Sequence, residues 1–192
     1  MATSAEMEQM PSELAAGPIE LRRRRLDHSA QLVAAMRASR PALARWFAWA
    51  QQEPTLEATR ARASASEENF DAGADFEFVL IETDTGEVVG MLRVNPTSGP
   101  GEAEIGYWVR SDREGRGYAT EATRAATTGT FAALSTIRVV RVAMDVANTR
   151  SAAVPRRLGF RLDHIEQRPI EAPGHSGRGQ VWLMDRDQWP TG

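Results

Sequence analysis

The 192-residue sequence contains no cysteine and no lysine, so all 23 of its basic residues are arginine. Without cysteine the chain can form no disulfide, no thiolate metal site and no cysteine nucleophile. Without lysine it can form neither a lysine Schiff base nor the GxxxxGK[ST] nucleotide-binding loop, because both need an ammonium group. These two absences exclude several classes of enzyme before any motif is considered.

The overall composition predicts a single globular domain. A net charge of −3 and a hydrophobic content of 42% are ordinary values, and this length suits one domain. The near-neutral charge argues against a nucleic-acid-binding protein, although Arg22–Arg25 form a basic run. No apolar run approaches the roughly 20 residues of a membrane span, and the first residues lack the pattern of a secretion signal. We therefore expect a cytoplasmic protein, a monomer or homodimer, with neither a membrane nor a nucleic acid as partner.

The periodicity of apolar residues predicts the order of the elements. Residues 1–17 are small, polar and acidic, and we expect a flexible tail there, so that one domain would comprise residues 18–192. Helical spacing runs over residues 28–50, where Pro41 should interrupt it, and over 55–71, where Thr55 should be the N-cap. Two more helices are expected, at 119–134 and just before Gly159.

Alternating or continuous apolar runs predict the strands. These runs lie at residues 19–26, 76–81, 88–94, 104–110, 137–146, 160–167 and 180–184. The run at 137–146 is apolar on both faces, as in a covered central strand, and 95–101 reads as a loop of helix and strand breakers. The expected fold is α/β (α+β), with one mixed, twisted sheet of about six to seven strands and about four helices.

A glycine-rich loop, Glu114-Gly115-Arg116-Gly117-Tyr118-Ala119, lies between an expected strand and an expected helix. Two glycines let the backbone approach a ligand closely, and the helix start adds partial positive charge, so the loop suits a phosphate group. Arg113 and Arg116 could contact the phosphate oxygens. A plain strand-to-helix turn explains the same residues about equally well. The dinucleotide-binding spacing fails, because Thr120 stands where its third glycine would be.

Two linked motifs resemble one family. The segment EIGYWVRSDREGRGYATEA begins at Glu104, and NTRSAAVPRRLGF follows at Asn148 after one helix and one strand. Together they resemble the GNAT superfamily of acyl-CoA-dependent N-acyltransferases, most of all the branch of ribosomal-protein alanine N-acetyltransferases (RimJ/RimL). The resemblance extends over about residues 19–189. It implies a single-domain GNAT fold with a splayed central strand pair, acetyl-CoA as co-substrate without a metal, and an amine as acceptor.

The resemblance also implies which residues bind coenzyme A. They are Val109, Arg110, Arg113, Gly115, Arg116, Gly117, Tyr118, Ala119, Thr120, Asn148 and Ser151. In the family the glycine loop holds the pyrophosphate, a backbone N–H near Val109 stabilises the oxygen of the tetrahedral intermediate, and Asn148 would orient the pantetheine chain. The family's loop begins with Gln or Arg where this chain has Glu114, and we expect Glu114 to point to solvent while backbone amides bind the phosphates.

Acetyl transfer to an amine needs one proton removed from the attacking ammonium and one delivered to the departing thiolate. An α-amine is about one-seventh neutral at pH 7, whereas a lysine amine is neutral about once in 2,500, so an α-amine needs only a weak base. Glu104 is the first candidate base, with a solvent-facing strand-end carboxylate as the alternative reading. Ser151, in the family's Asn-x-x-Ser motif, is the implied acid, with a helix N-cap as the alternative. The tyrosine acid of many GNAT enzymes has no counterpart, because the only tyrosines are Tyr107 and Tyr118.

Pro155 predicts where the last helix begins. A proline inside a helix costs about 3 kcal/mol and clashes with the carbonyl group four residues earlier, here that of Ser151. The helix should therefore start late, near Ser151, with Pro155 in its first turn.

The preferred function is direct acetyl transfer to a primary amine, with a protein N-terminal α-amine as the first candidate acceptor. A small-molecule amine (an amino acid, polyamine or antibiotic) and a catalytically inactive acyl-CoA-binding sensor are the alternatives. Glu114 favours the sensor.

Overall fold

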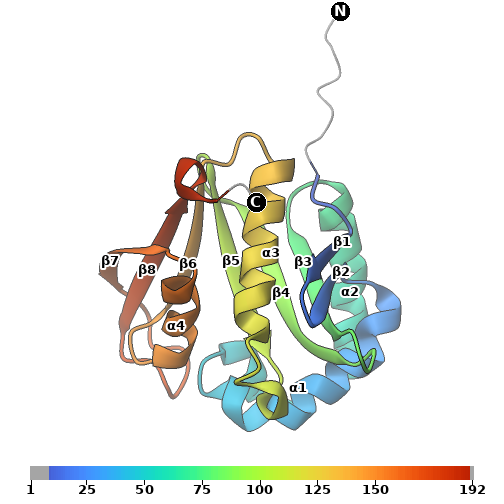
Figure 1. Ribbon diagram of the computed structural model, residues 1–192. Helices are drawn as coiled ribbons and strands as arrows, with labels where there is room; N and C mark the ends of the chain where they lie inside the picture. Colours follow the sequence, from blue (N-terminus) through green and yellow to red (C-terminus); the bar gives the residue numbers. More distant parts are fainter. Residues whose placement is uncertain (1–8, 191–192) are drawn as a thin grey trace, which may run out of the picture.

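One eight-stranded mixed sheet organises the protein (Figure 1). The structure, a computed structural model, describes residues 9–190, and only the backbone of residues 97 and 98. The strand order is β1-β2-β3-β4-β5-β6-β8-β7, and every neighbouring pair is antiparallel except β5 and β6. The strands are β1 (Glu13–Ala16), β2 (Ile19–Arg23), β3 (Phe76–Glu82), β4 (Val88–Gly99), β5 (Glu102–Val109), β6 (Val139–Asp145), β7 (Arg161–Gln167) and β8 (Arg178–Asp185). The mixed sheet is confirmed, with one strand more than expected.

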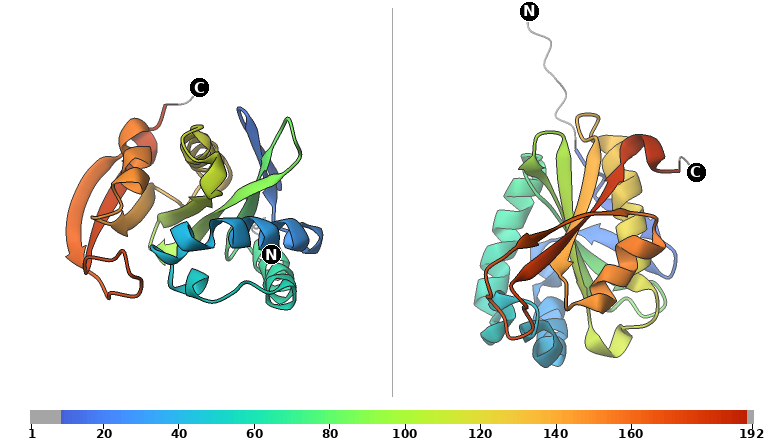
Figure 2. Two further views of the ribbon diagram at one scale, coloured as in Figure 1. Left: turned by 90° about the horizontal axis from the view of Figure 1, so that it is seen from below. Right: turned by 90° about the vertical axis from the view of Figure 1, so that its left-hand side faces the viewer.

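Four α-helices cover the two faces of this sheet (Figure 2). They are α1 (Ser29–Ala44), α2 (Leu56–Asp71), α3 (Tyr118–Ala133) and α4 (Thr149–Arg157). Helices α3 and α4 lie on one face, and α1 and α2 lie on the other. Apolar side chains are buried on both faces, with Leu80 and Ile105 in the cluster under α3 and Val79 in the cluster under α1. Thr55 caps α2 as predicted, because its side chain accepts a hydrogen bond from the N–H of Ala58.

Strand β1 lies inside the segment that we expected to be a flexible tail, so that expectation is wrong for Glu13–Ala16. Gly17, with φ of +63°, allows the tight turn by which β1 pairs antiparallel with β2. Leu14 then packs at Gly129 of α3, where the missing side chain leaves room for it. The pairing depends on this distant helix, which the local composition cannot reveal. Residues 1–8 of the expected tail lie outside the described residues.

Three other expectations need correction. Helix α1 continues through Pro41 to Ala44, and the burial of Leu43 against the sheet holds its last turn in place. Strand β4 continues to Gly99 through the expected loop, with an irregular register after Asn95. Strand β6 is fully buried only at alternate positions, Val140, Val142 and Met144, so it is covered more completely on one face than on the other.

Candidate active site

The strands β5 and β6 separate in the middle of the sheet. Their parallel pairing includes only three residue pairs, from Glu102 with Val139 to Glu104 with Arg141. Beyond this point β5 stays with β4 as far as Val109, while β6 stays with β8 as far as Asp145. A gap therefore opens between the two strand ends, toward the lower edge of the view in Figure 1. This is the splayed strand pair that the resemblance to the GNAT superfamily implies.

The backbone of Val109 faces this gap. The N–H of Arg110 donates to the carbonyl of Val89 on β4 at 2.7 Å. Successive N–H groups of a strand point in opposite directions within the sheet, so that of Val109 points away from β4, toward the separated β6. It is placed to donate a hydrogen bond to a group in the gap.

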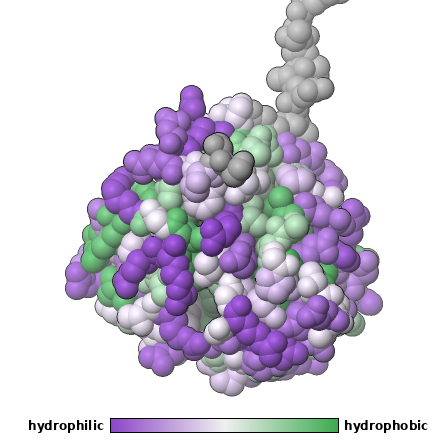
Figure 3. Space-filling model, in the orientation of Figure 1, coloured by the Kyte–Doolittle hydropathy of each residue, from purple (hydrophilic) through white to green (hydrophobic). Residues whose placement is uncertain are grey.

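The glycine loop lies beside the gap, directly before α3. Gly115 and Gly117 have φ of +78° and +83°, a conformation that favours glycine, and a Cβ added at either would meet nothing within 4 Å. Gly117 is the N-cap of α3, and no described residue accepts a hydrogen bond from the N–H of Tyr118 or Ala119. Open backbone and free N–H groups at a helix start suit the pyrophosphate of coenzyme A. Figure 3 shows a recess between α4 and this end of α3.

Carboxylates bind the arginines in the glycine loop and just before it. Arg113 lies 3.0 Å from Glu87 and 2.8 Å from Asp112, and its Nε is 3.6 Å from Glu82. Arg116 lies 3.2 Å from Glu82, and Arg110 pairs with Asp112 at 2.7 Å. These ion pairs lie toward the β3–β4 hairpin. The proposed contacts of these arginines with phosphate therefore stay a prediction, and they would require the guanidinium groups to leave or share their carboxylates.

Glu82, which the sequence analysis did not single out, organises this side of the loop. Its buried carboxylate accepts hydrogen bonds from the hydroxyls of Tyr118 and Thr85. The hydrogen bonds from Tyr118 and then Thr85 hold the pKa of Glu82 below its usual value. Tyr118 thus fixes the start of α3 from inside the protein. The available signal was a charged residue that directly follows the apolar run at residues 78–81, at the end of β3.

Glu114 does not simply point to solvent, as we had expected. Its Oε2 lies 2.6 Å from Nη1 of Arg150, in the first turn of α4. The ion pair joins the loop to the helix on the other side of the recess. Its two residues are 36 positions apart, so neither motif alone indicates the contact.

The late start predicted for α4 is wrong. The helix begins at Thr149, and Pro155 is its seventh residue. Asn148 is the N-cap, because its Oδ1 accepts the N–H of Ser151 at 3.2 Å, so Ser151 is not the cap. Pro155 has no N–H for the carbonyl of Ser151, but the hydroxyl of Tyr107 donates to that oxygen at 2.9 Å. A side chain of β5 thus replaces the missing helix hydrogen bond.

Tyr107 and Ser151 meet a second time through their hydroxyls. Ser151 Oγ donates to the Tyr107 hydroxyl at 3.2 Å, which places the serine beside the gap. Burial raises the pKa of Tyr107, and the hydrogen bond from Ser151 offsets this only in part. The phenol therefore stays protonated at neutral pH and remains a donor. Tyr107 received no role among the predicted site residues, although its place two residues before Val109 puts it at the same strand end.

Glu104 faces the opposite side of the sheet. Ala103 and Ile105 are buried under α3, so the alternating Glu104, Gly106 and Trp108 point toward the side of α1. Glu104 Oε2 lies 3.1 Å from Nε of Arg141 on β6, and its side chain is 40% exposed. A Cβ added at Gly106 would meet nothing within 4 Å, which leaves open space between Glu104 and Trp108.

Aromatic residues border that open space. The ring of Trp108 lies 6.3 Å from that of Trp49, which in turn lies 5.4 Å from Phe47. Trp49, in the short helix η2 (Ala48–Gln51), is half-exposed. The candidate acid and base thus lie on opposite faces of the sheet, with the gap between β5 and β6 connecting them. An acyl donor from the α3–α4 side and an amine from the α1 side can meet in such a gap.

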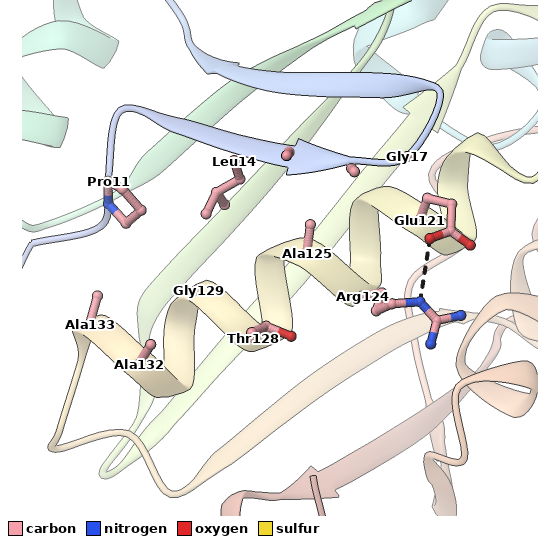
Figure 4. Close-up of a pocket in the computed structure, with 12 residues that line it drawn as sticks. Pro11, Leu14, Gly17, Glu121, Arg124, Ala125, Thr128, Gly129, Ala132 and Ala133 are labelled. Atoms are coloured by element: carbon pink, nitrogen blue, oxygen red, sulfur yellow. Dashed lines mark hydrogen bonds and ion pairs between the residues drawn. The ribbon is translucent and has the colours of Figure 1, made fainter. Parts of the chain in front are cut away.

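A groove of about 640 Å³ lies elsewhere (Figure 4). It runs between β1 and α3, on the flank of α3 that faces away from α4, and small apolar residues form most of its lining. Its charged lining residues, Glu121 and Arg124, pair with each other at 3.4 Å. The groove therefore brings no catalytic groups together.

Among the described residues no group of three His, Cys, Asp or Glu could hold a metal ion, and no helix is long and apolar enough to span a membrane.

A separated parallel strand pair with a glycine loop at the following helix defines an acyl-CoA-binding fold. Residues 19–161 match the family described as the acetyltransferase (GNAT) domain. The chain belongs to this family, whose acyl donor is acetyl-CoA. The predictions of the family, of an acetyltransferase and of its co-substrate are confirmed.

Several solved or curated proteins are similar to the chain. RimJ of Mycobacterium smegmatis in complex with CoA-disulfide is 25% identical, with a TM-score of 0.82 over 96% of this chain and 91% of that one. The ribosomal L7/L12 acetyltransferase RimL in complex with coenzyme A is 22% identical, with a TM-score of 0.80 over 93% of this chain and 98% of that one. This likeness supports the fold. "Putative ribosomal N-acetyltransferase YdaF" of Bacillus subtilis (strain 168) is 44% identical over 59 residues, a match that spans 32% of its length.

Proposed function

We propose that the chain transfers the acetyl group of acetyl-CoA directly to a primary amine, and that this amine is the N-terminal α-amine of a protein. The observation that carries the proposal is the gap between β5 and β6. An N–H donor at Val109, a hydroxyl at Ser151 and a carboxylate at Glu104 all lie along it. The RimJ and RimL likenesses and the YdaF match support a ribosomal-protein acceptor, because their names describe such enzymes.

Each of these residues has one task. Acetyl-CoA, when bound, supplies an activated thioester carbonyl. The N–H of Val109 donates to the carbonyl oxygen as negative charge develops there. Glu104 accepts the proton that the attacking ammonium must lose, and Ser151 donates its hydroxyl proton to the departing thiolate sulfur. Tyr107 keeps the Ser151 hydroxyl beside the gap, because its phenol oxygen accepts the hydrogen bond from Ser151 Oγ, and the serine oxygen recovers its proton from solvent.

A carboxylate as the base favours an α-amine over a lysine side chain. Any carboxylate is a much weaker base than an amine, and Glu104 also holds an ion pair with Arg141 at 3.1 Å. At pH 7 about one-seventh of an α-amine is already neutral, against about one in 2,500 for a lysine amine, so only the α-amine reacts with such weak help. The free space over Gly106, beside the aromatic residues, is where a peptide end can enter.

The test is an acceptor panel with acetyl-CoA, read by thiol release and by mass spectrometry of the products. It contains peptides with a free N-terminus, the same peptides with a blocked N-terminus and an internal lysine, and small amines. We expect acetylation of the free α-amine and none of the blocked peptides. Better turnover of a lysine or a small amine would overturn the proposed acceptor. Tight coenzyme A binding without turnover on any amine would identify a sensor instead.

A further inference from the structure

The ion pair between Glu114 and Arg150 joins the glycine loop to the first turn of α4. Glu114 is the first residue of the loop, and Arg150 lies one residue before Ser151 in α4. The side chain of Arg150 is 74% exposed, and its Nη1 lies 2.6 Å from Glu114 Oε2. The loop and α4 are therefore joined by a contact between one largely exposed and one partly exposed side chain.

The charges around the loop make this arginine different from its neighbours. A carboxylate at the first position of a phosphate-binding loop repels the ligand, and Glu114 is such a carboxylate. The arginines within the loop segment are bound elsewhere, since Arg116 pairs with Glu82 and Arg113 pairs with Glu87 and Asp112. Arg150 has Glu114 as its one ion-pair partner among the described residues.

We propose that Arg150 binds the pyrophosphate of coenzyme A, and that Glu114 holds the guanidinium beside the glycine loop until the phosphates replace its carboxylate. The inference rests on the proposed use of acetyl-CoA. It assigns to the facing helix a positive charge that Arg113 and Arg116, which are held by carboxylates, do not offer freely. Glu114 then competes with the ligand instead of binding it.

Physical chemistry favours this exchange. Exposed ion pairs add little to stability, so releasing Glu114 costs the protein little. A pyrophosphate carries two negative charges where the carboxylate carries one, and the planar guanidinium can donate two parallel hydrogen bonds to phosphate oxygens. The free N–H groups at the start of α3 bind the same ligand from the other side of the recess.

The experiment measures ligand binding by calorimetry, without turnover. The protein and its variants R150Q and E114Q are titrated with coenzyme A, with dephospho-coenzyme A, which lacks the 3′-phosphate, and with pantetheine, which has no phosphate. The matched control is R157Q, which removes the same charge from the last turn of the same helix. Melting temperatures check that each variant is folded.

We expect R150Q to raise the dissociation constants of coenzyme A and dephospho-coenzyme A about tenfold or more, as for the loss of a charged hydrogen bond. E114Q should lower both dissociation constants roughly two- to fivefold, as expected for removal of a competing exposed ion pair. Neither variant should change pantetheine binding, and R157Q should have little effect on any ligand.

Other outcomes overturn the exchange. Equal coenzyme A affinity in R150Q, an equal loss in R157Q, or an equal loss of pantetheine binding would each show that Arg150 does not bind the phosphates. If R150Q weakens the binding of coenzyme A but not that of dephospho-coenzyme A, the partner of Arg150 is the 3′-phosphate and not the pyrophosphate. Weaker binding by E114Q would make Glu114 a support of the site rather than a competitor. If the unaltered protein binds no coenzyme A at all, the proposed function itself fails.

Discussion

The Tyr107 hydroxyl donates a hydrogen bond to the carbonyl oxygen of Ser151, the group that Pro155 leaves without a helix partner. The two residues come from β5 and α4, which lie on the two sides of the gap. A proline that would otherwise weaken the helix thus creates an acceptor for a buried phenol. The same phenol oxygen also accepts a hydrogen bond from the Ser151 hydroxyl at 3.2 Å. The backbone and the hydroxyl of the proposed acid are therefore held by one side chain.

Replacing Tyr107 by phenylalanine removes only the hydroxyl. The carbonyl of Ser151 then loses its partner, which should lower the free energy of unfolding by roughly 1–3 kcal/mol. We also expect kcat to fall severalfold while the dissociation constant of coenzyme A stays the same, because the Ser151 hydroxyl is no longer oriented. Denaturant unfolding, steady-state kinetics and calorimetry measure the three quantities. An unchanged kcat would show that Tyr107 supports only the fold.

The role of Pro155 can be tested separately by a double-mutant cycle. In P155A the new N–H of residue 155 can donate to the carbonyl of Ser151. Y107F should therefore cost less stability in the P155A background than in the unaltered protein, with a coupling of about 1 kcal/mol. Denaturant unfolding of the two single variants and the double variant gives this coupling. Additive losses would mean that the proline and the tyrosine act independently.

Removing the hydroxyl of Ser151 should affect turnover more than binding. We expect S151A to lower kcat about 100-fold, the low end of general acid catalysis, because a thiol of pKa about 8.5 needs only modest help to leave. Coenzyme A affinity should change little. Y107F added to S151A should cause no further loss of kcat, since its effect acts through the serine. A full further loss in the double variant would contradict this order of action.

Glu104 can be tested by the pH dependence of its variant. If the base only removes the ammonium proton, E104Q should lose on the order of sevenfold in rate at pH 7, the inverse of the neutral fraction of an α-amine. The loss should shrink near pH 9, where solvent deprotonates the amine without help. E102Q, at the preceding position on the same face of β5, is the matched control. A defect in E104Q that is constant with pH would remove Glu104 from the role of base.

The sequence predicted the features that depend on neighbouring residues, but not those that depend on distant ones. The glycine loop and the start of α3 were expected within one residue of where they lie, because the glycines and the helical pattern are local signals. The start of α4 was misjudged because Tyr107, 44 residues before Ser151, supplies the hydrogen bond to the Ser151 carbonyl that Pro155 cannot make. The partner of Glu114 and the pairing of β1 were likewise set by residues that only the fold brings together.

A buried ion pair away from the site makes a prediction about stability. Glu77 lies 2.7 Å from both Arg24 and Arg62, and the side chains of Glu77 and Arg24 are almost fully buried. Burial is the largest single influence and raises the pKa of Glu77, but the two arginines together lower it below its ordinary value. Glu77 is therefore a charged group that the folded state stabilises.

Removing that charge should be costly at neutral pH and harmless in acid. E77Q leaves Arg24 buried without a counter-charge, and we expect a loss of about 3 kcal/mol in the free energy of unfolding at pH 7. Because the folded state lowers the pKa of Glu77, its contribution is complete above the ordinary value of 4.5 and is lost as the pH falls through the lower folded value. Urea unfolding of the two proteins should therefore converge once the pH falls below the folded pKa of Glu77. E57Q, an exposed position in the first turn of α2, should stay within about 1 kcal/mol of the unaltered protein throughout. A difference that persists in acid would show that packing, and not the charge of Glu77, accounts for the loss.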